Sequence, residues 1–363
     1  MLQIRRPQHG FTIVELMVAI AVGLLMLAGL STLFAGNNNS QMEIERANRQ
    51  VENGRYAMQV LTGDLRNAGY FGEFDATNIV PATLPDPCST SIADIRAAIP
   101  LAVQGYDNVA ATTVSCLSTA GIKPGTDVVV VRHTQTCVVD AADCEPASAG
   151  GPFFQASLCN NNFELGAGTT AGAYQVGTST GGFTLHQRNC SADGTSGTAA
   201  VLRRLLIHIY FIANNSMTGD GIPTLKRADI VSSGNTISVS IVPLAEGIEN
   251  MQIEYGIENP ADELAVPSVA DGVADVYTPD VNTAFACSAA ACRLANWSHV
   301  VSLKVNLLAR TLSPSLTYTD NKSYNLGMKA DGTPNVIAAA NDKYKRHVFT
   351  QMVGLPNVAG RIK

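Results

Sequence analysis

The strongest pattern in the sequence is an apolar run near the N-terminus, in which no charged residue occurs between Leu16 and Gly36. As an α-helix this run would be about 31 Å long, close to the ~30 Å hydrocarbon core of a bilayer. Arg5 and Arg6 precede it, and basic residues tend to stay on the cytoplasmic side of a membrane helix. The pattern predicts one membrane-spanning helix whose N-terminus is cytoplasmic.

Glu15, at the start of this run, separates several explanations of the hydropathy. A secretory signal peptide needs a small-x-small cleavage site after the run, and residues 35–39 supply only a loose version. A simple anchor does not account for Glu15, because a carboxylate near the start of a membrane helix costs about 1–3 kcal/mol unless it is paired or reaches the interface. The run is also too long and too uniformly apolar for a buried core helix. We therefore expect Glu15 to have a function and a partner.

The helical pattern continues beyond the apolar run. Apolar residues recur there at the spacing of one helix face: Val51, Met58, Leu61 and Leu65. No proline occurs between residues 11 and 80, so one long helix can extend to about Asn67, with Gly69 as its stop. Gly54 and Gly63 would weaken it locally. We expect this half to pack on the chain's own sheet and the membrane-proximal half to meet lipid or other subunits.

Strand patterns follow, and they become regular in the later half of the chain. Segments with strand-like composition lie at residues 127–132, 182–186, 205–212, 222–230, 236–242, 251–256, 300–308 and 345–352. Consecutive strands on short turns predict an antiparallel sheet with a helix on one face. Residues 160–200 and 313–334 are polar or rich in small residues and are expected to form loops. The predicted fold class is α+β, a long N-terminal helix packed on an antiparallel β-sheet head.

Composition limits the class of partner. Hydrophobic residues make up 46% of the chain and charged residues 15%, and the formal net charge is −6. Such a chain has ample material for a core. It has no excess of Lys and Arg to neutralise a phosphate backbone, so nucleic acid is not expected as a partner.

Eight cysteines follow the apolar run: Cys88, Cys116, Cys137, Cys144, Cys159, Cys190, Cys287 and Cys292. An even number in loop-like surroundings is typical of disulfides in an oxidising compartment. Zinc is the alternative, but structural zinc sites combine C-x2-4-C pairs with each other or with paired histidines. The two closest pairs have C-x6-C and C-x4-C spacings, of which only the second fits. Disulfides with loop-closing roles are therefore expected, and their connectivity stays open.

No catalytic or cofactor-binding motif is found. The P-loop, G-x-S-x-G, H-E-x-x-H and dinucleotide fingerprints are absent from the sequence. Single histidines lie within or beside strand candidates, at His133, His186, His208, His299 and His347. A lone strand histidine is more often structural than catalytic. We expect no enzyme activity and no cofactor.

An acidic turn surrounds Cys144. Asp140, Asp143 and Glu145 could bind calcium through oxygen ligands, but they lack the loop spacing of an EF-hand. We interpret them as a solvated acidic turn and expect no metal.

A short motif joins the basic leader to the apolar run, and it carries a family resemblance. The residues Gly10-Phe11-Thr12-Ile13-Val14-Glu15-Leu16 resemble the class III signal of type IV prepilins. The resemblance implies that a membrane aspartyl peptidase cuts after Gly10 and methylates Phe11. The new N-terminus would carry a cationic amine, and Glu15, then the fifth residue, could neutralise the amine of an adjacent subunit. The helix would serve first as membrane anchor and later as part of the fibre core.

A second resemblance lies at the end of the predicted helix. The stretch ENGRYAMQVLTGDLRNAGYFG, together with the large size, is similar to PilW-type minor pilins of type IV pili. Relatives often place a cysteine just after the GYFG-like turn, where this chain has Glu73, so their disulfide pattern is not transferred. The two resemblances cover the first 75 or so residues strongly and the head only loosely.

The resemblance implies a division of the chain and a set of partners. Residues 1–10 would be a cleaved leader, 11–36 the transmembrane and assembly helix, 37–68 its amphipathic half, and 69–363 an extracytoplasmic head. The expected partners are the prepilin peptidase and methyltransferase, other minor pilins, the major pilin and a large tip adhesin. The protein would reside in the inner membrane with its head in the periplasm, and then in the pilus fibre at or near the tip, where it helps to prime assembly.

Two other interpretations remain. A GspJ-like minor pseudopilin of a type II secretion system would share the signal and the fold. A membrane-tethered periplasmic enzyme or calcium-dependent adhesin would do its work in the head, and a convergent polar cluster in a head pocket would favour it.

Overall fold

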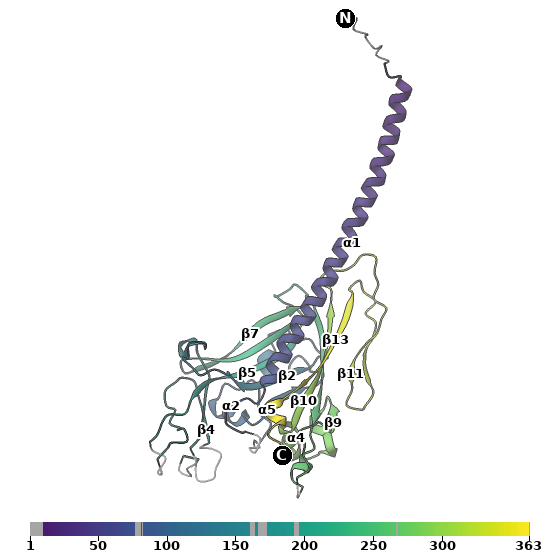
Figure 1. The fold of residues 1–363 in the computed structure, drawn as a ribbon. Helices are drawn as coiled ribbons and strands as arrows, with labels where there is room; N and C mark the ends of the chain where they lie inside the picture. The colour runs from purple at the N-terminus through teal and green to yellow at the C-terminus, as the bar shows by residue number, and fades with distance from the viewer. Residues whose placement is uncertain are drawn as a thin grey trace, which may run out of the picture. The chain divides into compact units, whose positions relative to one another are not determined.

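The computed structural model describes residues 10–76, 81, 83–159, 164–165, 173–191, 196–265 and 268–362. The predicted leader therefore lies outside the described residues except for Gly10, and so do Arg5 and Arg6. The chain divides into two compact units, Met1–Arg49 and Gln50–Lys363. Helix α1, Ile13–Asn67, contributes to both (Figure 1).

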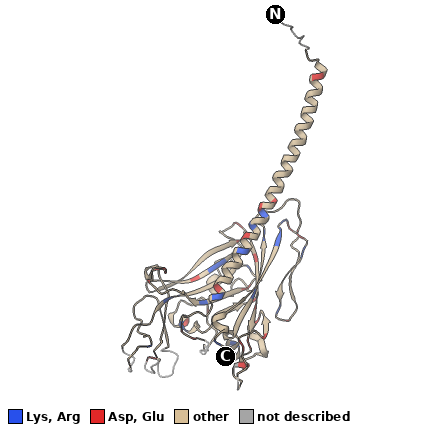
Figure 2. Cartoon of the chain, in the orientation of Figure 1, with Lys and Arg blue, Asp and Glu red and all other residues tan. Residues whose placement is uncertain are grey.

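The first unit contains the N-terminal part of α1. This is the one helix in the described part of the chain that is long and apolar enough to cross a membrane, with a mean hydropathy of 2.5 in its best window and no buried residue there. Charged side chains return only after the apolar run (Figure 2). They form the ion pairs Glu43–Arg46 and Glu45–Arg49, one helical turn apart.

The second unit is built on antiparallel strands in three sheets. The seven-stranded sheet contains β1 Val103–Tyr106, β2 Val128–Thr134, β3 Phe153–Ala156, β4 Tyr174–Gly177, β5 Leu202–Ala213, β6 Thr224–Ser233 and β7 Thr236–Glu246. Its order is β1-β2-β5-β3-β4, and β6 pairs with both β5 and β7. The long strand β5 is thus the centre of the sheet.

The other two sheets come mainly from the C-terminal half. The four-stranded sheet has the order β13-β10-β8-β9 and contains β8 Ile248–Ile257, β9 Val276–Thr278, β10 Val300–Arg310 and β13 Arg346–Gly354. The hairpin β11 Tyr324–Met328 and β12 Pro334–Ile337 forms the third sheet. The second unit also has four short α-helices: α2 Ile92–Ala98 before β1, α3 Pro260–Glu263 and α4 Ala290–Ser298 between strands, and α5 Pro356–Ala359 after β13.

The C-terminal part of α1 forms one hydrophobic core with inner residues of both large sheets. Leu61 and Leu65 of α1 are fully buried and belong to the same cluster as Val131 of β2 and Leu303 of β10. The predicted stripe is therefore correct for Met58, Leu61 and Leu65, whereas Val51 is only half-buried. The helix ends at Asn67, and Gly69 adopts a φ of +76°, a conformation that favours glycine.

A second core covers the opposite face of the seven-stranded sheet. The rings of Phe74 and Tyr174 lie 5.2 Å apart there, and both belong to a cluster that includes Val130 of β2. Every residue of β2 is buried, which explains why residues 128–131 are four consecutive valines rather than an alternating pattern.

Several sequence predictions of individual elements need correction. Residues 182–186 form no strand and contribute only an isolated bridge from His186 to Ala199. Residues 313–334 are not a simple exposed loop, because β11 lies within them and Asp320 and Leu326 are buried. Polar composition was misleading here, since Asp320 is neutralised by Arg346 inside the fold.

Candidate functional site

The first described residues of the chain are exposed to solvent. Gly10 and Phe11 are exposed, and 90% of the Phe11 surface is accessible. They precede α1, which begins at Ile13. A peptide bond in non-helical, uncovered backbone is one that a peptidase can reach.

Thr12 and Glu15 cap the start of α1 reciprocally. The Thr12 N–H donates to Oε2 of Glu15 at 2.9 Å, and the Glu15 N–H donates to Oγ1 of Thr12 at 3.2 Å. This arrangement is a capping box, which satisfies two N–H groups that have no partner inside the helix. Within the described residues Oε1 of Glu15 accepts no hydrogen bond, so one carboxylate oxygen is available to a further donor.

The apolar helix surface has no partner within its own unit. Its large apolar side chains are between 45% and 78% exposed from Ile13 to Phe34. An exposed apolar surface of this extent is not stable in water, and it marks contact with lipid or protein.

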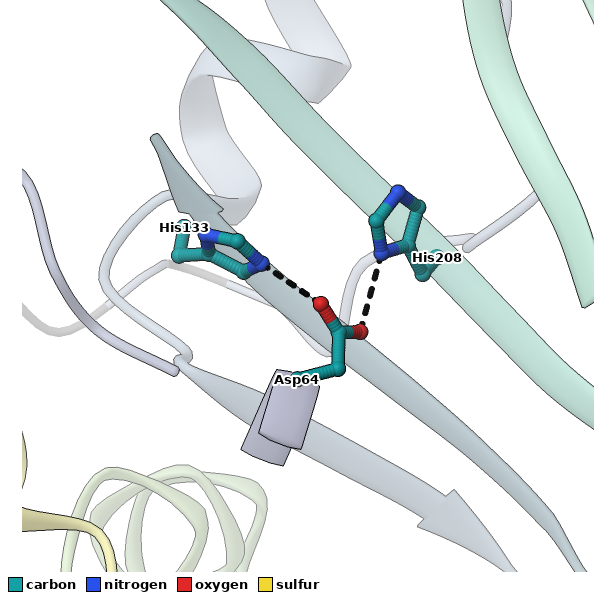
Figure 3. A group of neighbouring side chains, drawn as sticks. All are labelled: Asp64, His133 and His208. Atoms are coloured by element: carbon teal, nitrogen blue, oxygen red, sulfur yellow. Dashed lines mark hydrogen bonds and ion pairs between the residues drawn. The ribbon is translucent and has the colours of Figure 1, made fainter. Parts of the chain in front are cut away.

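The structure overturns the expectation that the histidines stand singly. His133 on β2 and His208 on β5 meet at Asp64 of α1 (Figure 3). The distances are 2.8 Å from His133 Nε2 to Asp64 Oδ1 and 2.9 Å from His208 Nδ1 to Asp64 Oδ2. The Tyr210 hydroxyl also donates to Oδ2, at 2.9 Å. These partners are separated from Asp64 by 69 to 146 positions, so no local motif announces them.

Both ring nitrogens of His133 face hydrogen-bond acceptors. Its Nδ1 lies 2.9 Å from the carbonyl oxygen of Thr134, and its Nε2 faces the Asp64 carboxylate. Burial raises the pKa of Asp64, but hydrogen bonds from His133 and His208 and their positive charge outweigh it and hold that pKa well below its usual range.

The ligand atoms of Asp64, His133 and His208 are close enough to surround a metal ion. However, each of these inward atoms already takes part in a hydrogen bond. The group is therefore complete as a buried ion pair, and it fastens the last turn of α1 to β2 and β5.

A second acidic group lies at the end of β8, where Glu258, Asp262 and Asp275 have ligand atoms within 4.8 Å of one another. Unlike Asp64, Glu258 has a buried oxygen, Oε2, without a hydrogen-bond partner. The acidic turn around Cys144 is different. Asp140 accepts a hydrogen bond from the Ala147 N–H at 2.8 Å, and Glu145 pairs with Arg204.

The eight cysteines form four disulfides: Cys88–Cys116, Cys137–Cys144, Cys159–Cys190 and Cys287–Cys292. Each joins neighbours in sequence order, which is consistent with the predicted closure of loops rather than of a zinc site. The disulfide-closed head is thus confirmed, and the connectivity that the sequence left open is defined.

Two family models match the chain. Residues 209–357 match the family described as Type IV Pilus-assembly protein W, and residues 5–31 match the prokaryotic N-terminal methylation motif. The first covers the strands from β6 to β13, and the second includes Gly10, Phe11 and Glu15. No curated protein sequence matches the chain.

Among solved structures, the type IV-like pilin TTHA1219 from Thermus thermophilus is similar. It aligns with 86% of this chain and 98% of its own, at 11% identity and a TM-score of 0.34. A likeness this distant carries no inference about function.

Proposed function

We propose that the chain is a minor pilin of a type IV pilus, because residues 209–357 match the Type IV Pilus-assembly protein W family and residues 5–31 match the N-terminal methylation motif. In this proposal the peptidase cuts after Gly10, Phe11 is methylated, and the mature protein waits in the inner membrane. It then joins other minor pilins to prime the fibre and stays at or near the tip.

The observation that carries the proposal is the match of residues 5–31 to the methylation motif, in which Gly10 and Phe11 are exposed. Gly10 and Phe11 lie just before α1, where the backbone is exposed. The apolar run that follows gives the helix a membrane-length surface with no partner of its own. Residues 11–36 would thus be anchor and assembly helix, 37–68 the amphipathic half, and 69–363 the head.

The free Oε1 of Glu15 supports a role in assembly. The capping box uses Oε2, so the carboxylate can hold the helix start and still accept a hydrogen bond from the cationic N-terminus of a neighbouring subunit. Such a pair removes two uncompensated charges from an apolar environment at once, and it fixes the register between helices.

The topology follows from the same features. Arg5 and Arg6 would hold the leader in the cytoplasm, and the head would lie in the periplasm, where its four disulfides can form. The prepilin peptidase, the other minor pilins, the major pilin and a large tip adhesin are the proposed partners.

Intact mass and N-terminal sequencing of the protein from its native membrane test the processing step. The expected chain begins at methylated Phe11. A chain that still begins at Met1, or that begins after the apolar run, would contradict the proposal. Quantitative immunoblots of sheared pili test the position, since a tip subunit is expected at far fewer copies than the major pilin.

A further inference from the structure

The connection between β8 and β9 begins and ends with an acidic residue. Glu258 directly follows β8 and Asp275 directly precedes β9. The strands are in register there, with Ile257 opposite Val276, and the Asp275 N–H donates to the Ile257 carbonyl at 2.9 Å. The backbone itself therefore holds two acidic residues side by side.

A third carboxylate is brought to the same place by helix α3. Asn259 caps α3, with its side chain accepting from the Ala261 N–H. Its own N–H donates to Oδ2 of Asp275 at 2.8 Å, and its carbonyl accepts from the Asp262 N–H at 3.0 Å. As a result, oxygens of Glu258, Asp262 and Asp275 lie within 4.8 Å of one another.

Within the residues that the structure describes, no positively charged side chain pairs with this group. In the described parts of the chain, no Lys, Arg or His side chain comes within 4.0 Å of these three carboxylates to form an ion pair. The charged neighbours that act on Glu258 are Asp275 and Asp271, both acidic. Together with burial, which is the larger cause, they raise the pKa of Glu258.

Glu258 is also incompletely satisfied. Only 2% of its surface is exposed, and Oε1 accepts from the Asp271 N–H at 3.2 Å while Oε2 is buried without any partner. Leaving a buried acceptor unpaired costs about 1–3 kcal/mol, and more for a charged group, so such atoms are rare in native folds. This unpaired oxygen belongs to a residue whose carboxylate lies beside those of Asp262 and Asp275.

We propose that Glu258, Asp262 and Asp275 bind a calcium ion. An all-oxygen set of carboxylates suits a hard cation, and calcium accepts irregular geometry and completes its 6–8 ligands with water and carbonyl oxygens. Zinc would prefer nitrogen and sulfur ligands. The ion neutralises the three carboxylates and provides a partner for Oε2 of Glu258. It also links α3 to the ends of β8 and β9.

The test is calorimetric titration of the full chain, purified in detergent and stripped of metal with a chelator, with CaCl2. We expect one saturable site in the wild type, and a loss of affinity of about tenfold or more in Glu258→Gln and in Asp275→Asn, since calcium affinity follows the ligand charge. Asp143→Asn, in the acidic turn beside Cys144, is the matched control and should bind like the wild type. Asp275 is exposed, so Asp275→Asn tests the site at a position where the substitution does not alter the buried core.

Thermal unfolding of the same proteins, without and with calcium, provides a second readout. Calcium should change the difference in unfolding temperature between the wild type and Glu258→Gln. Without calcium, Glu258→Gln should unfold at or above the wild-type temperature, because the substitution removes a buried, uncompensated charge. With calcium, the wild type should gain stability and the variant should not. The proposal is overturned if the wild type shows no saturable calcium binding, or if binding survives in both ligand variants or is equally lost in Asp143→Asn.

Discussion

Oδ1 of Asp64, one turn before the end of α1, lies 2.8 Å from Nε2 of His133 on β2. This contact, with those from His208 and Tyr210, fastens the end of α1 to β2 and β5.

Asp64→Asn should therefore destabilise the head. The substitution removes the carboxylate that His133, His208 and Tyr210 share, and removing one partner of a buried pair costs about 3 kcal/mol. Urea unfolding at pH 7 checks the value. Glu52→Gln, at an exposed position of the same helix, is the control and should change stability by less than about 0.5 kcal/mol. An Asp64→Asn variant as stable as the control would show that the pair contributes nothing.

The same residue predicts acid sensitivity. The pKa of Asp64 is lowered by folding from its ordinary value of 3.8, so the folded state binds fewer protons than the unfolded state as pH falls. Its contribution to stability is present above the unfolded pKa and is lost as pH falls below it, through the acidic range toward the folded pKa. The stability gap between the wild type and Asp64→Asn should shrink as the pH falls below about 4. Unfolding curves at several pH values measure it, and a pH-independent gap would contradict the assignment.

Two glycines of α1 should respond in opposite directions to the same substitution. Gly63 is exposed, and a Cβ there would meet no atom within 4 Å, so Gly63→Ala should stabilise by about 0.5–1 kcal/mol through helix propensity. A Cβ on Gly54 would collide with the ring of Phe349, so Gly54→Ala should destabilise by about 1–3 kcal/mol despite the better propensity. Thermal unfolding of both variants measures the two stability changes. Changes of the same sign would show that α1 does not approach β13 this closely.

Replacing Gly10 should block processing without disturbing the fold. A Cβ there would meet no other atom within 4 Å, so the effect of Gly10→Val would arise at the peptidase. The expected product keeps the leader, which intact mass detects directly. Gly36→Val is the matched control, because its surroundings are equally open, and it should be cut normally.

Glu15 variants separate charge pairing from helix capping. Glu15→Ala should leave processing largely intact and impair assembly. Gln can still complete a capping box but carries no charge, so Glu15→Gln should fail like Glu15→Ala if the partner is a cationic N-terminus. The readout is the amount of the protein in sheared pili, with membrane levels as reference. Normal incorporation of Glu15→Ala into pili would contradict a role of Glu15 in assembly. Normal incorporation of Glu15→Gln but not of Glu15→Ala would show that Glu15 acts as a helix cap.

The disulfides should differ in their contribution to stability. In the loop-entropy model, the bridge across 28 positions between Cys88 and Cys116 contributes about 3.5 kcal/mol, and the bridge across 5 positions between Cys287 and Cys292 about 2 kcal/mol. Double Ser variants of each pair, compared by urea unfolding, should keep this order. The reverse order would mean that loop closure is not the dominant effect.

Local sequence pattern was enough to predict the membrane-length helix and the motif that precedes it. The apolar run, the Gly10–Phe11 junction and Glu15 are contiguous, and both the bilayer and a peptidase recognise a contiguous segment. The stripe at Met58, Leu61 and Leu65 was also visible, because helical period alone identifies the buried face. Strands β2, β5, β6, β7, β8, β10 and β13 were predicted from composition and turns, whereas short strands such as β1 and β9 carried too little pattern.

The sites in the head were decided by tertiary structure. Asp64, His133 and His208 are ordinary isolated residues in the sequence, and only the packing of α1 on β2 and β5 makes them one buried charged group. Glu258 and Asp275 meet because β8 and β9 pair, and the cost of the unpaired Oε2 exists only once Glu258 is buried. Sequence determines what a contiguous segment offers to a membrane or an enzyme; desolvation and long-range contact, which set the chemistry of the head, exist only in the fold.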